Sequence, residues 1–188
     1  MSTALRQHIE KITSLTDAEF EYVSSLFSRK KLKKHQFLIQ EDTEVLNDYW
    51  VISGLLKAYH TDAEGKIHIL QFAMEDWWIS DYQALHNRTP ATIAIDCIED
   101  CELLVLSREN KEKLCKELHS VSEFFRQKSS AGYVALQQRI LLLLNKTPQE
   151  RYNRLFKLQP LLLQRLPKTL LASYLGVSRE TLSRLNHP

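Results

Sequence analysis

The C-terminal part of the chain reads LPKTLLASYLGVSRETLSRL over residues 166–185. Its apolar spacing predicts one helix over about residues 167–174, which ends at Leu175-Gly176 because glycine supplies the left-handed conformation of a helix C-terminus. Ser178 is typical of an N-cap and begins a second helix after a short turn. Ala172 is small where two such helices would cross. The stretch therefore predicts a helix-turn-helix, with a small core of Leu171, Leu175, Val177, Leu182 and Leu185.

Polar residues occupy one face of the second helix, at its N-terminal end. This is the part of a helix-turn-helix that enters the major groove of DNA. Arginine donates a bidentate pair of hydrogen bonds to guanine, and glutamate accepts from the cytosine amino group. An ordinary solvated helix face is the alternative interpretation. The candidate base contacts are Arg179, Glu180, Ser183 and Arg184, and the candidate phosphate contacts are Lys168, Thr169, Ser178 and Thr181.

The net charge of +2 is divided unevenly along the chain. Residues 1–106 carry 10 Lys and Arg against 17 Asp and Glu, a net −7, and residues 107–188 carry 15 against 6, a net +9. An acidic half joined to a basic half indicates two tasks, with a polyanion as the partner of the second. Because the helix-turn-helix lies in the basic half, double-stranded DNA is the partner that charge and motif both favour.

The length and composition are those of a globular protein. The chain has 188 residues, 44% of them hydrophobic and 26% charged, which is enough for one domain or two small ones. No apolar run approaches the ~18 residues needed to span a bilayer, so no membrane partner is expected. The N-terminus lacks the apolar core of a signal peptide, which predicts a cytoplasmic location.

Short strands are predicted between residues 35 and 106. Turn signals at Ser53-Gly54 and over residues 62–65 separate runs that are rich in aliphatic, β-branched or aromatic residues. Several short strands at regular spacing favour an antiparallel sandwich or barrel. A short helix is expected over Ser80–Asn87. The predicted strands are Phe37–Gln40, Tyr49–Ile52, Leu55–His60, Ile67–Phe72, Ala91–Ile95 and Leu103–Leu106.

Two capping boxes mark helix starts outside this region. Thr16 with Glu19 begins a helix over about residues 16–28, because the hydroxyl and the carboxylate satisfy each other's backbone donors. Thr147-Pro148-Gln149-Glu150 begins another, which Gln159-Pro160 is expected to break.

A long helix is predicted over residues 120–145, after a shorter one over residues 107–118. The long helix carries an apolar stripe, with small residues at Ala131-Gly132. A helix of this length that packs one face on its own domain can present the other face to a second copy, which predicts a homodimer. The alternative is that both faces pack within the monomer.

The segment Ser178-Arg179-Glu180-Thr181-Leu182-Ser183-Arg184, behind a strand-rich part and a long helix, resembles the Crp/Fnr family of bacterial transcription regulators over nearly the whole chain. Ile52-Ser53-Gly54-Leu55-Leu56-Lys57, followed by the Glu64-Gly65 turn, resembles the β-roll of that family, and helix 120–145 resembles its dimerisation helix. The resemblance implies an α+β fold. Its parts are an N-terminal antiparallel β-roll of the cyclic nucleotide-binding type, a long dimerisation helix, and a C-terminal helix-turn-helix that is winged-helix-like with a short or missing wing.

The resemblance also implies a division of labour. Residues 1–118 would be the sensor, residues 119–146 the dimerisation helix and residues 147–188 the DNA-binding domain. Glu180 and Arg184 would read a TGA-containing half-site of an inverted repeat, with Arg179 or Ser183 adjusting the flanking bases. RNA polymerase is a further partner that the family suggests.

The cyclic-AMP-binding members hold the cyclic phosphate in a cassette with a Gly-Glu pair and a later Arg-Ser or Arg-Thr pair. In this chain Ser80-Asp81 stands at the first position and Ala91-Thr92 at the second. The arginine is absent, and Ser80 denies the close backbone approach that glycine allows. Because a phosphodiester would be poorly compensated there, cyclic AMP is not expected to bind.

An unknown small-molecule effector and no effector at all are both open at this point. Trp78 and Tyr82 lie near the cassette, and Leu136 and Gln137 of the long helix fall near the adenine-contacting positions of the family. These four residues are the candidate lining of an effector pocket. For the aromatic residues, filling of the roll is the alternative.

The sequence gives no sign of an enzyme or of a resident cofactor. It lacks paired histidines with cupin spacing, a Gly-rich phosphate loop and a Ser/His/Asp group. Cys97, Cys101 and Cys115 are too few for an iron–sulfur cluster and are expected to be structural thiols, with a redox switch as the alternative. The competing function is a ligand-binding or protein-interaction module whose DNA-binding domain is vestigial.

Overall fold

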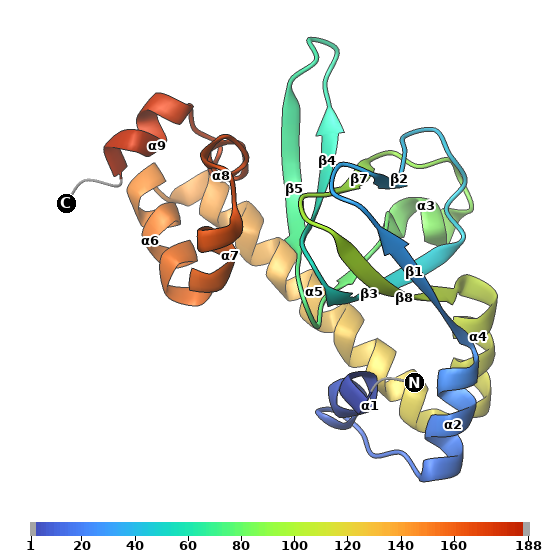
Figure 1. Ribbon diagram of the computed structural model, residues 1–188. Helices are drawn as coiled ribbons and strands as arrows, with labels where there is room; N and C mark the ends of the chain where they lie inside the picture. The colour runs from blue at the N-terminus through green and yellow to red at the C-terminus, as the bar shows by residue number, and fades with distance from the viewer. Residues whose placement is uncertain (1–2, 186–188) are drawn as a thin grey trace. The chain divides into compact units, whose positions relative to one another are not determined.

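The computed structural model describes residues 3–185, which form two compact units (Figure 1). Of the described residues, the first unit comprises 3–58 and 72–131, and the second comprises 59–71 and 132–185. The chain order of the elements is α1 (Thr3–Glu10), α2 (Asp17–Ser25), β1 (Phe27–Leu32), β2 (Phe37–Ile39), β3 (Asn47–Ser53), β4 (Leu56–Thr61), β5 (Ile67–Ala73), β6 (Trp78–Ile79), α3 (Tyr82–Asn87), β7 (Ala94–Cys97), β8 (Cys101–Ser107), α4 (Arg108–Glu117), α5 (His119–Asn145), α6 (Pro148–Leu158), α7 (Pro160–Arg165), α8 (Lys168–Leu175) and α9 (Arg179–Leu185).

The strands form two four-stranded sheets, in the orders β1-β8-β3-β6 and β2-β7-β4-β5. Pairing is antiparallel between β1 and β8, β8 and β3, β3 and β6, and β2 and β7. In the middle of the first sheet the register runs from Asn47 opposite Ser107 to Val51 opposite Leu103. The α+β fold with an antiparallel β-roll, a long helix and C-terminal helices, which the sequence predicts, is confirmed.

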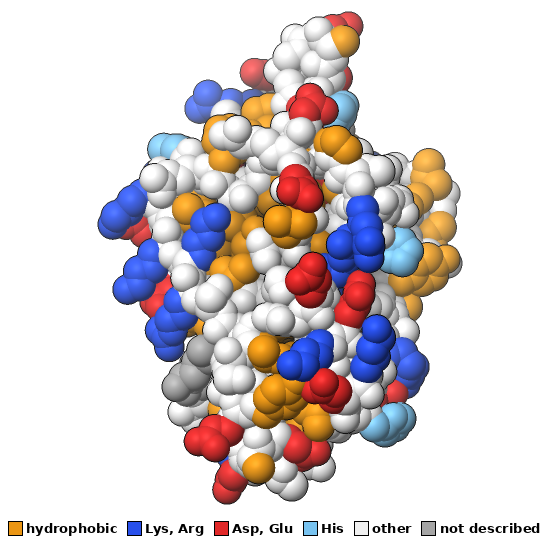
Figure 2. Space-filling model, turned by 90° about the vertical axis from the view of Figure 1, so that its right-hand side faces the viewer, with side chains coloured by type: hydrophobic (Ala, Val, Ile, Leu, Met, Phe, Trp, Pro, Cys, Tyr) orange, Lys and Arg blue, Asp and Glu red, His pale blue; other side chains and the backbone are white. Residues whose placement is uncertain are grey.

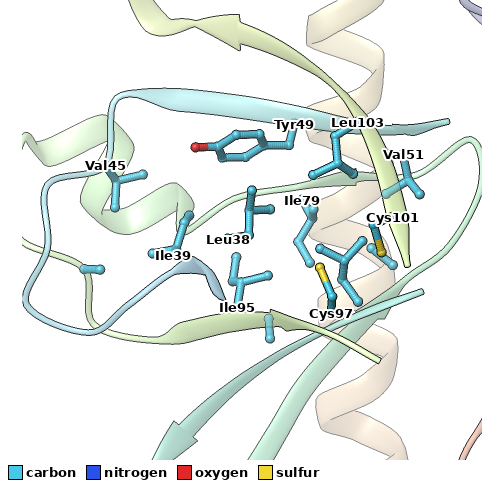
Figure 3. Packing of buried hydrophobic residues seen from close by; sticks show 14 of the residues in the cluster. Leu38, Ile39, Val45, Tyr49, Val51, Ile79, Ile95, Cys97, Cys101 and Leu103 are labelled. Atoms are coloured by element: carbon cyan, nitrogen blue, oxygen red, sulfur yellow. The ribbon is translucent and has the colours of Figure 1, made fainter. Parts of the chain in front are cut away.

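The apolar core of the roll contains side chains from both sheets. Figure 3 shows Tyr49 and Leu103 of the first sheet together with Leu38 and Ile95 of the second, and all four are buried. Because side chains alternate along a strand, Leu103 belongs to this cluster whereas its neighbour Leu104 packs on the opposite face of the first sheet.

Helices supply the second apolar cluster of the first unit. Trp50 and Leu104 from the sheet are buried there with Leu5 of α1, Leu114 of α4 and Phe124 at the start of α5. The long helix therefore begins as part of the roll domain, and its buried residues are all in this first portion, at Val121, Phe124 and Phe125. The boundary between the two units falls inside α5, between Ala131 and Gly132.

The predicted helix over residues 16–28 is wrong at its C-terminal end. Both bonds of the capping box form, since the Thr16 side chain accepts from the Glu19 N–H and the Glu19 carboxylate accepts from Thr16, but the helix ends at Ser25. Phe27 begins β1 and lies opposite Leu106 of β8. Pairing with a distant strand thus overrides a helical spacing that continues locally.

Further differences concern segments without a strong local pattern. α1, β6 and α7 are absent from the sequence prediction, and β7 begins at Ala94 rather than at Ala91. Gln159-Pro160 ends α6 as expected, yet Pro160 also begins α7. Proline is tolerated at a first helical position because the N–H there has no partner within the helix.

Candidate nucleic-acid interface

Helices α8 and α9 occupy the positions predicted for the helix-turn-helix. The turn between them depends on Gly176, which has φ 66° and ψ 40° and whose N–H donates to the carbonyls of Ala172 and Ser173. A side chain at this left-handed position would be strained. Ser178 then accepts from the Thr181 N–H at 3.1 Å, as the predicted N-cap should.

A small apolar core holds the two helices together. Leu171, Ala172 and Leu175 of α8 are buried, and Leu182 of α9 is completely buried. Leu162 of α7 and Leu166, which follows it, are also buried. Burial of one face of α9 leaves its other face to solvent.

That other face carries the four candidate base contacts. Arg179, Glu180, Ser183 and Arg184 are all exposed, on a helix whose only buried residue is Leu182. The arrangement presents two guanidinium groups, a carboxylate and a hydroxyl, which are the donor and acceptor types that distinguish base pairs in the major groove.

The carboxylate of this face is ionised at neutral pH. Its own backbone N–H contributes most to lowering the pKa of Glu180, followed by a hydrogen bond from Ser178 and by the positive charges of Arg179 and Arg184. An ionised carboxylate only accepts hydrogen bonds, so it is suited to the amino groups of cytosine or adenine.

The candidate phosphate contacts divide into two kinds. Lys168 and Thr169 are exposed in the first turn of α8. Ser178 and Thr181 have hydroxyl oxygens 3.2 Å apart and engage each other at the start of α9. The latter pair therefore shapes the helix start in this structure, whereas the former is free to approach a phosphate.

The part of α5 in the second unit exposes an apolar stripe. Tyr133 is 70% exposed, Leu136 56% and Leu144 73%, and Ile140 and Leu141 are each 49% exposed. Solvent-exposed apolar side chains in such a row are unusual on a monomer surface and are typical of surfaces that bind a partner. On the face shown in Figure 2, acidic and basic side chains are interspersed with apolar ones.

The cassette residues are buried and bonded to one another. The Ser80 hydroxyl donates to the Asn47 carbonyl at 2.8 Å. Asp81 is 2% exposed and accepts from the Ala84 N–H at 3.0 Å, from the Thr92 N–H at 2.7 Å and from the Thr92 hydroxyl at 3.0 Å. Ala91 is 3% exposed and offers no charge. The Asp81 carboxylate thus accepts the hydrogen bonds that the Ala84 N–H, the Thr92 N–H and the Thr92 hydroxyl can donate.

The candidate effector-pocket residues have separate environments. Trp78 packs against Phe27, Phe124 and Phe125 and donates its indole N–H to His8 at 3.1 Å. Burial lowers the pKa of His8 to about 4, so His8 accepts this bond as a neutral ring. Trp78 therefore serves the core of the first unit.

The remaining candidates have other surroundings, each within its own unit. Tyr82 is 46% exposed and donates to Asp48 at 3.1 Å. Leu136 and Gln137 line a shallow groove of about 160 Å³ on one face of α5. Sequence reasoning missed a larger cavity of about 400 Å³ in the first unit, because its lining comes from separate loops. That lining consists of Asp42, Glu44, Val45, Leu46, Arg88, Thr89, Pro90 and Arg108.

The cysteines are free thiols, with Cys97 and Cys101 buried and Cys115 half-buried. The Cys101 thiol lies 3.2 Å from the Glu99 carbonyl, and a hydrogen bond with Cys101 together with burial raises the pKa of Cys97. Within residues 3–185, no group of three or more His, Cys, Asp or Glu side chains is arranged to hold a metal ion. Among the same residues, none of the helices has both the length and the apolar character of a bilayer span.

Solved structures of bacterial regulators resemble the chain over most of its length. FixK2 from Bradyrhizobium japonicum has a TM-score of 0.71 at 20% identity, covering 85% of this chain and 82% of that one. CLP, a regulator of Xanthomonas campestris described as responsive to c-di-GMP, has a TM-score of 0.69 at 14% identity, covering 90% and 89%. The Catabolite Activator Protein of Thermus thermophilus has a TM-score of 0.55 at 23% identity, covering 92% and 83%.

Comparisons of sequence give a curated relative and a family of domains. The anaerobic regulatory protein of Bacillus subtilis is 26% identical over 99 residues, which are 53% of this chain and 40% of that protein, so less than half of the relative's length is matched. Residues 29–118 match the family of cyclic nucleotide-binding domains. This part of the chain is therefore similar to a cyclic nucleotide-binding domain. The fold of the chain is like that of solved regulators of the Crp/Fnr type, which confirms the resemblance seen in the sequence.

Proposed function

We propose that this protein is a dimeric, sequence-specific DNA-binding regulator of transcription. The observation that carries the proposal is the exposed polar face of α9, where Arg179, Glu180, Ser183 and Arg184 stand on a helix held by a buried leucine. The described relatives are regulators rather than enzymes, which supports the same conclusion.

The exposed apolar stripe of α5 is the proposed dimer interface. Two copies related by a two-fold axis would present two reading helices, which matches an inverted repeat with half-sites about one helical turn apart. In this proposal residues 1–118 act as the roll domain, 119–146 join the two copies and 147–188 bind DNA. RNA polymerase is the further partner we propose, in the cytoplasm.

Selection from a random double-stranded DNA library tests the proposal. The expected result is enrichment of a palindromic site, with binding that weakens as salt rises because phosphate contacts release counterions. Repeating the selection with and without cell metabolites addresses an effector at the same time. Failure to enrich any palindrome would favour the competing function, a ligand-binding or protein-interaction module with a vestigial DNA-binding domain.

Arg184→Ala is expected to weaken specific DNA binding by about 1–3 kcal/mol and to relax one base position. The reason is the loss of a bidentate donor to a base edge, since the side chain is exposed and supports no core. Competition binding against sites with single-base changes measures both effects. Lys168→Ala is the matched comparison, because loss of a phosphate contact should weaken all sites alike and reduce the salt slope by about 1. An unchanged base preference would remove Arg184 from the readout.

We further propose that the roll domain does not bind cyclic AMP. Asp81 already accepts from the Thr92 and Ala84 backbone donors, and Ala91 supplies no cation to a phosphodiester. Titration calorimetry with cyclic AMP should give no saturable heat in the micromolar range. A regulator known to bind cyclic AMP, measured in parallel, is the control. Saturable micromolar heat from the wild-type protein would contradict this part of the proposal.

A further inference from the structure

Arg139 of α5 joins three elements of the second unit. One of its terminal guanidinium nitrogens donates to the Ile69 carbonyl of β5 at 2.8 Å and to the Tyr174 carbonyl of α8 at 3.2 Å. The guanidinium carbon also lies 3.7 Å from the centroid of the Tyr174 ring. Burial lowers the pKa of Arg139, and its interaction with Tyr174 opposes that shift. These contacts place one cation between the long helix, a strand and the first helix of the helix-turn-helix.

A neighbouring hydrogen bond also connects α8 to β5. The Ser173 hydroxyl donates to the Ile67 carbonyl at 2.7 Å. Because β5 is the last strand of its sheet, one edge of it has no strand partner among residues 3–185. Carbonyls two residues apart, such as those of Ile67 and Ile69, point to the same edge of a strand. Two consecutive residues of α8 are therefore connected to that edge: Ser173 bonds to it directly, and Tyr174 is joined to it through Arg139.

The attachment fixes more than α8. Helix α9 shares a buried core with α8, so any element that holds α8 also holds the helix that presents the candidate base contacts. If a linker alone attached the helix-turn-helix to α5, the distance between the two α9 helices of the proposed dimer would vary. Fixing α8 to α5 and β5 would make that distance constant.

We infer that Arg139 is a positioning residue that fastens the helix-turn-helix to α5 and to the edge of β5, and thereby sets the half-site spacing that the dimer accepts. This inference rests on the proposed function. Lysine cannot fully replace the arginine, because an ammonium does not offer a planar group that stacks on the Tyr174 ring while one of its nitrogens donates to two carbonyls.

The first experiment needs no DNA. Hydrogen exchange of the full-length protein is compared among the wild type, Arg139→Gln, Arg139→Lys and Ser173→Ala. Exchange over residues 168–176 should be roughly ten-fold faster in Arg139→Gln and intermediate in Arg139→Lys. The matched control is Arg126→Gln, on the same helix, because Arg126 is exposed and pairs with Glu123 three residues before it. Unchanged exchange in a folded Arg139→Gln protein would overturn the inference.

The second experiment uses the selected inverted repeat with the half-sites moved one base pair closer or farther apart. The wild type and Arg126→Gln should prefer one spacing by at least about ten-fold, because bringing both reading helices into register requires a fixed separation. Arg139→Gln should keep the half-site sequence but bind the three spacings within about three-fold of one another. A general folding defect would instead weaken all sites equally.

The outcomes separate the two proposals. A wild type that selects an inverted repeat, together with an Arg139→Gln protein of unchanged spacing preference, would overturn the positioning role and leave the proposed function intact. A wild type that selects no repeat would overturn the proposed function and the spacing role with it, and hydrogen exchange alone would then decide whether Arg139 fastens α8. If Arg139→Gln does not fold, Ser173→Ala is used for the same two measurements.

Discussion

Lys111→Met should lower the free energy of unfolding by about 3–5 kcal/mol, because it leaves a buried carboxylate without its cation. Asp48 is 1% exposed, and one of its carboxylate oxygens lies 2.6 Å from the Lys111 ammonium. The Tyr82 hydroxyl and the Tyr49 N–H also donate to this carboxylate, but neither carries a charge. Methionine keeps an unbranched apolar side chain beside the Phe125 ring, which the ammonium faces at 4.3 Å.

The decrease in the free energy of unfolding caused by Lys111→Met should depend on pH. Burial raises the pKa of Asp48, and Lys111 opposes this shift, so the variant should have a pKa that is raised further. An acid with a raised pKa binds its proton more tightly in the folded state, so its contribution to stability falls as pH rises from the ordinary carboxyl value through the folded value. The difference between variant and wild type should therefore be largest near pH 7 and become smaller towards about pH 4.

Denaturant unfolding at both pH values measures this difference. Lys33→Met is the matched control, because Lys33 pairs with Asp100 on the surface and both side chains are more than half exposed. That pair is expected to contribute no more than about 1 kcal/mol. A Lys111→Met protein that loses as little as the control, or that loses the same amount at both pH values, would contradict the account of Asp48.

Local signals in the sequence were sufficient for much of the fold. Both capping boxes form as predicted, at Thr16 and Thr147, and Gly176 adopts the expected left-handed turn. These features depend on residues within one turn of a helix, so the sequence contains all of their partners. By contrast, the segment Thr3–Glu10 is held by burial of Leu5 and Ile9 against residues that are distant in the sequence.

In the candidate site, too, features that depend on neighbouring residues could be predicted, and features that depend on distant residues could not. The exposed face of α9 follows from helical spacing alone, which places Glu180 and Arg184 away from Leu182. Arg139 could not be singled out, because its acceptors are backbone carbonyls and every residue type offers a backbone carbonyl. For Asp81, the resemblance to the family implied a cassette position but not the bonds to Thr92, eleven residues later.

Leu182→Ala should abolish selection of DNA while leaving the roll domain folded. Leu182 is completely buried in the small core between α8 and α9, and truncating a buried leucine costs about 2–5 kcal/mol. A helix pair with so few buried side chains has little stability to lose, so the reading face of α9 would no longer be held in place. Limited proteolysis should accordingly begin within residues 168–185.

Fluorescence separates this local effect from global unfolding. The three tryptophans, Trp50, Trp77 and Trp78, all belong to the first unit, so their denaturation transition reports on the roll domain. That transition should be unchanged in Leu182→Ala, and it should also be unchanged in the control Leu161→Ala, whose leucine is 63% exposed on α7. The control should retain DNA selection, because removing an exposed side chain opens no cavity. If Leu182→Ala shifted the tryptophan transition as far as the proteolytic one, the two units would unfold as one. If it bound DNA like the wild type, α9 would not depend on this core for its reading role.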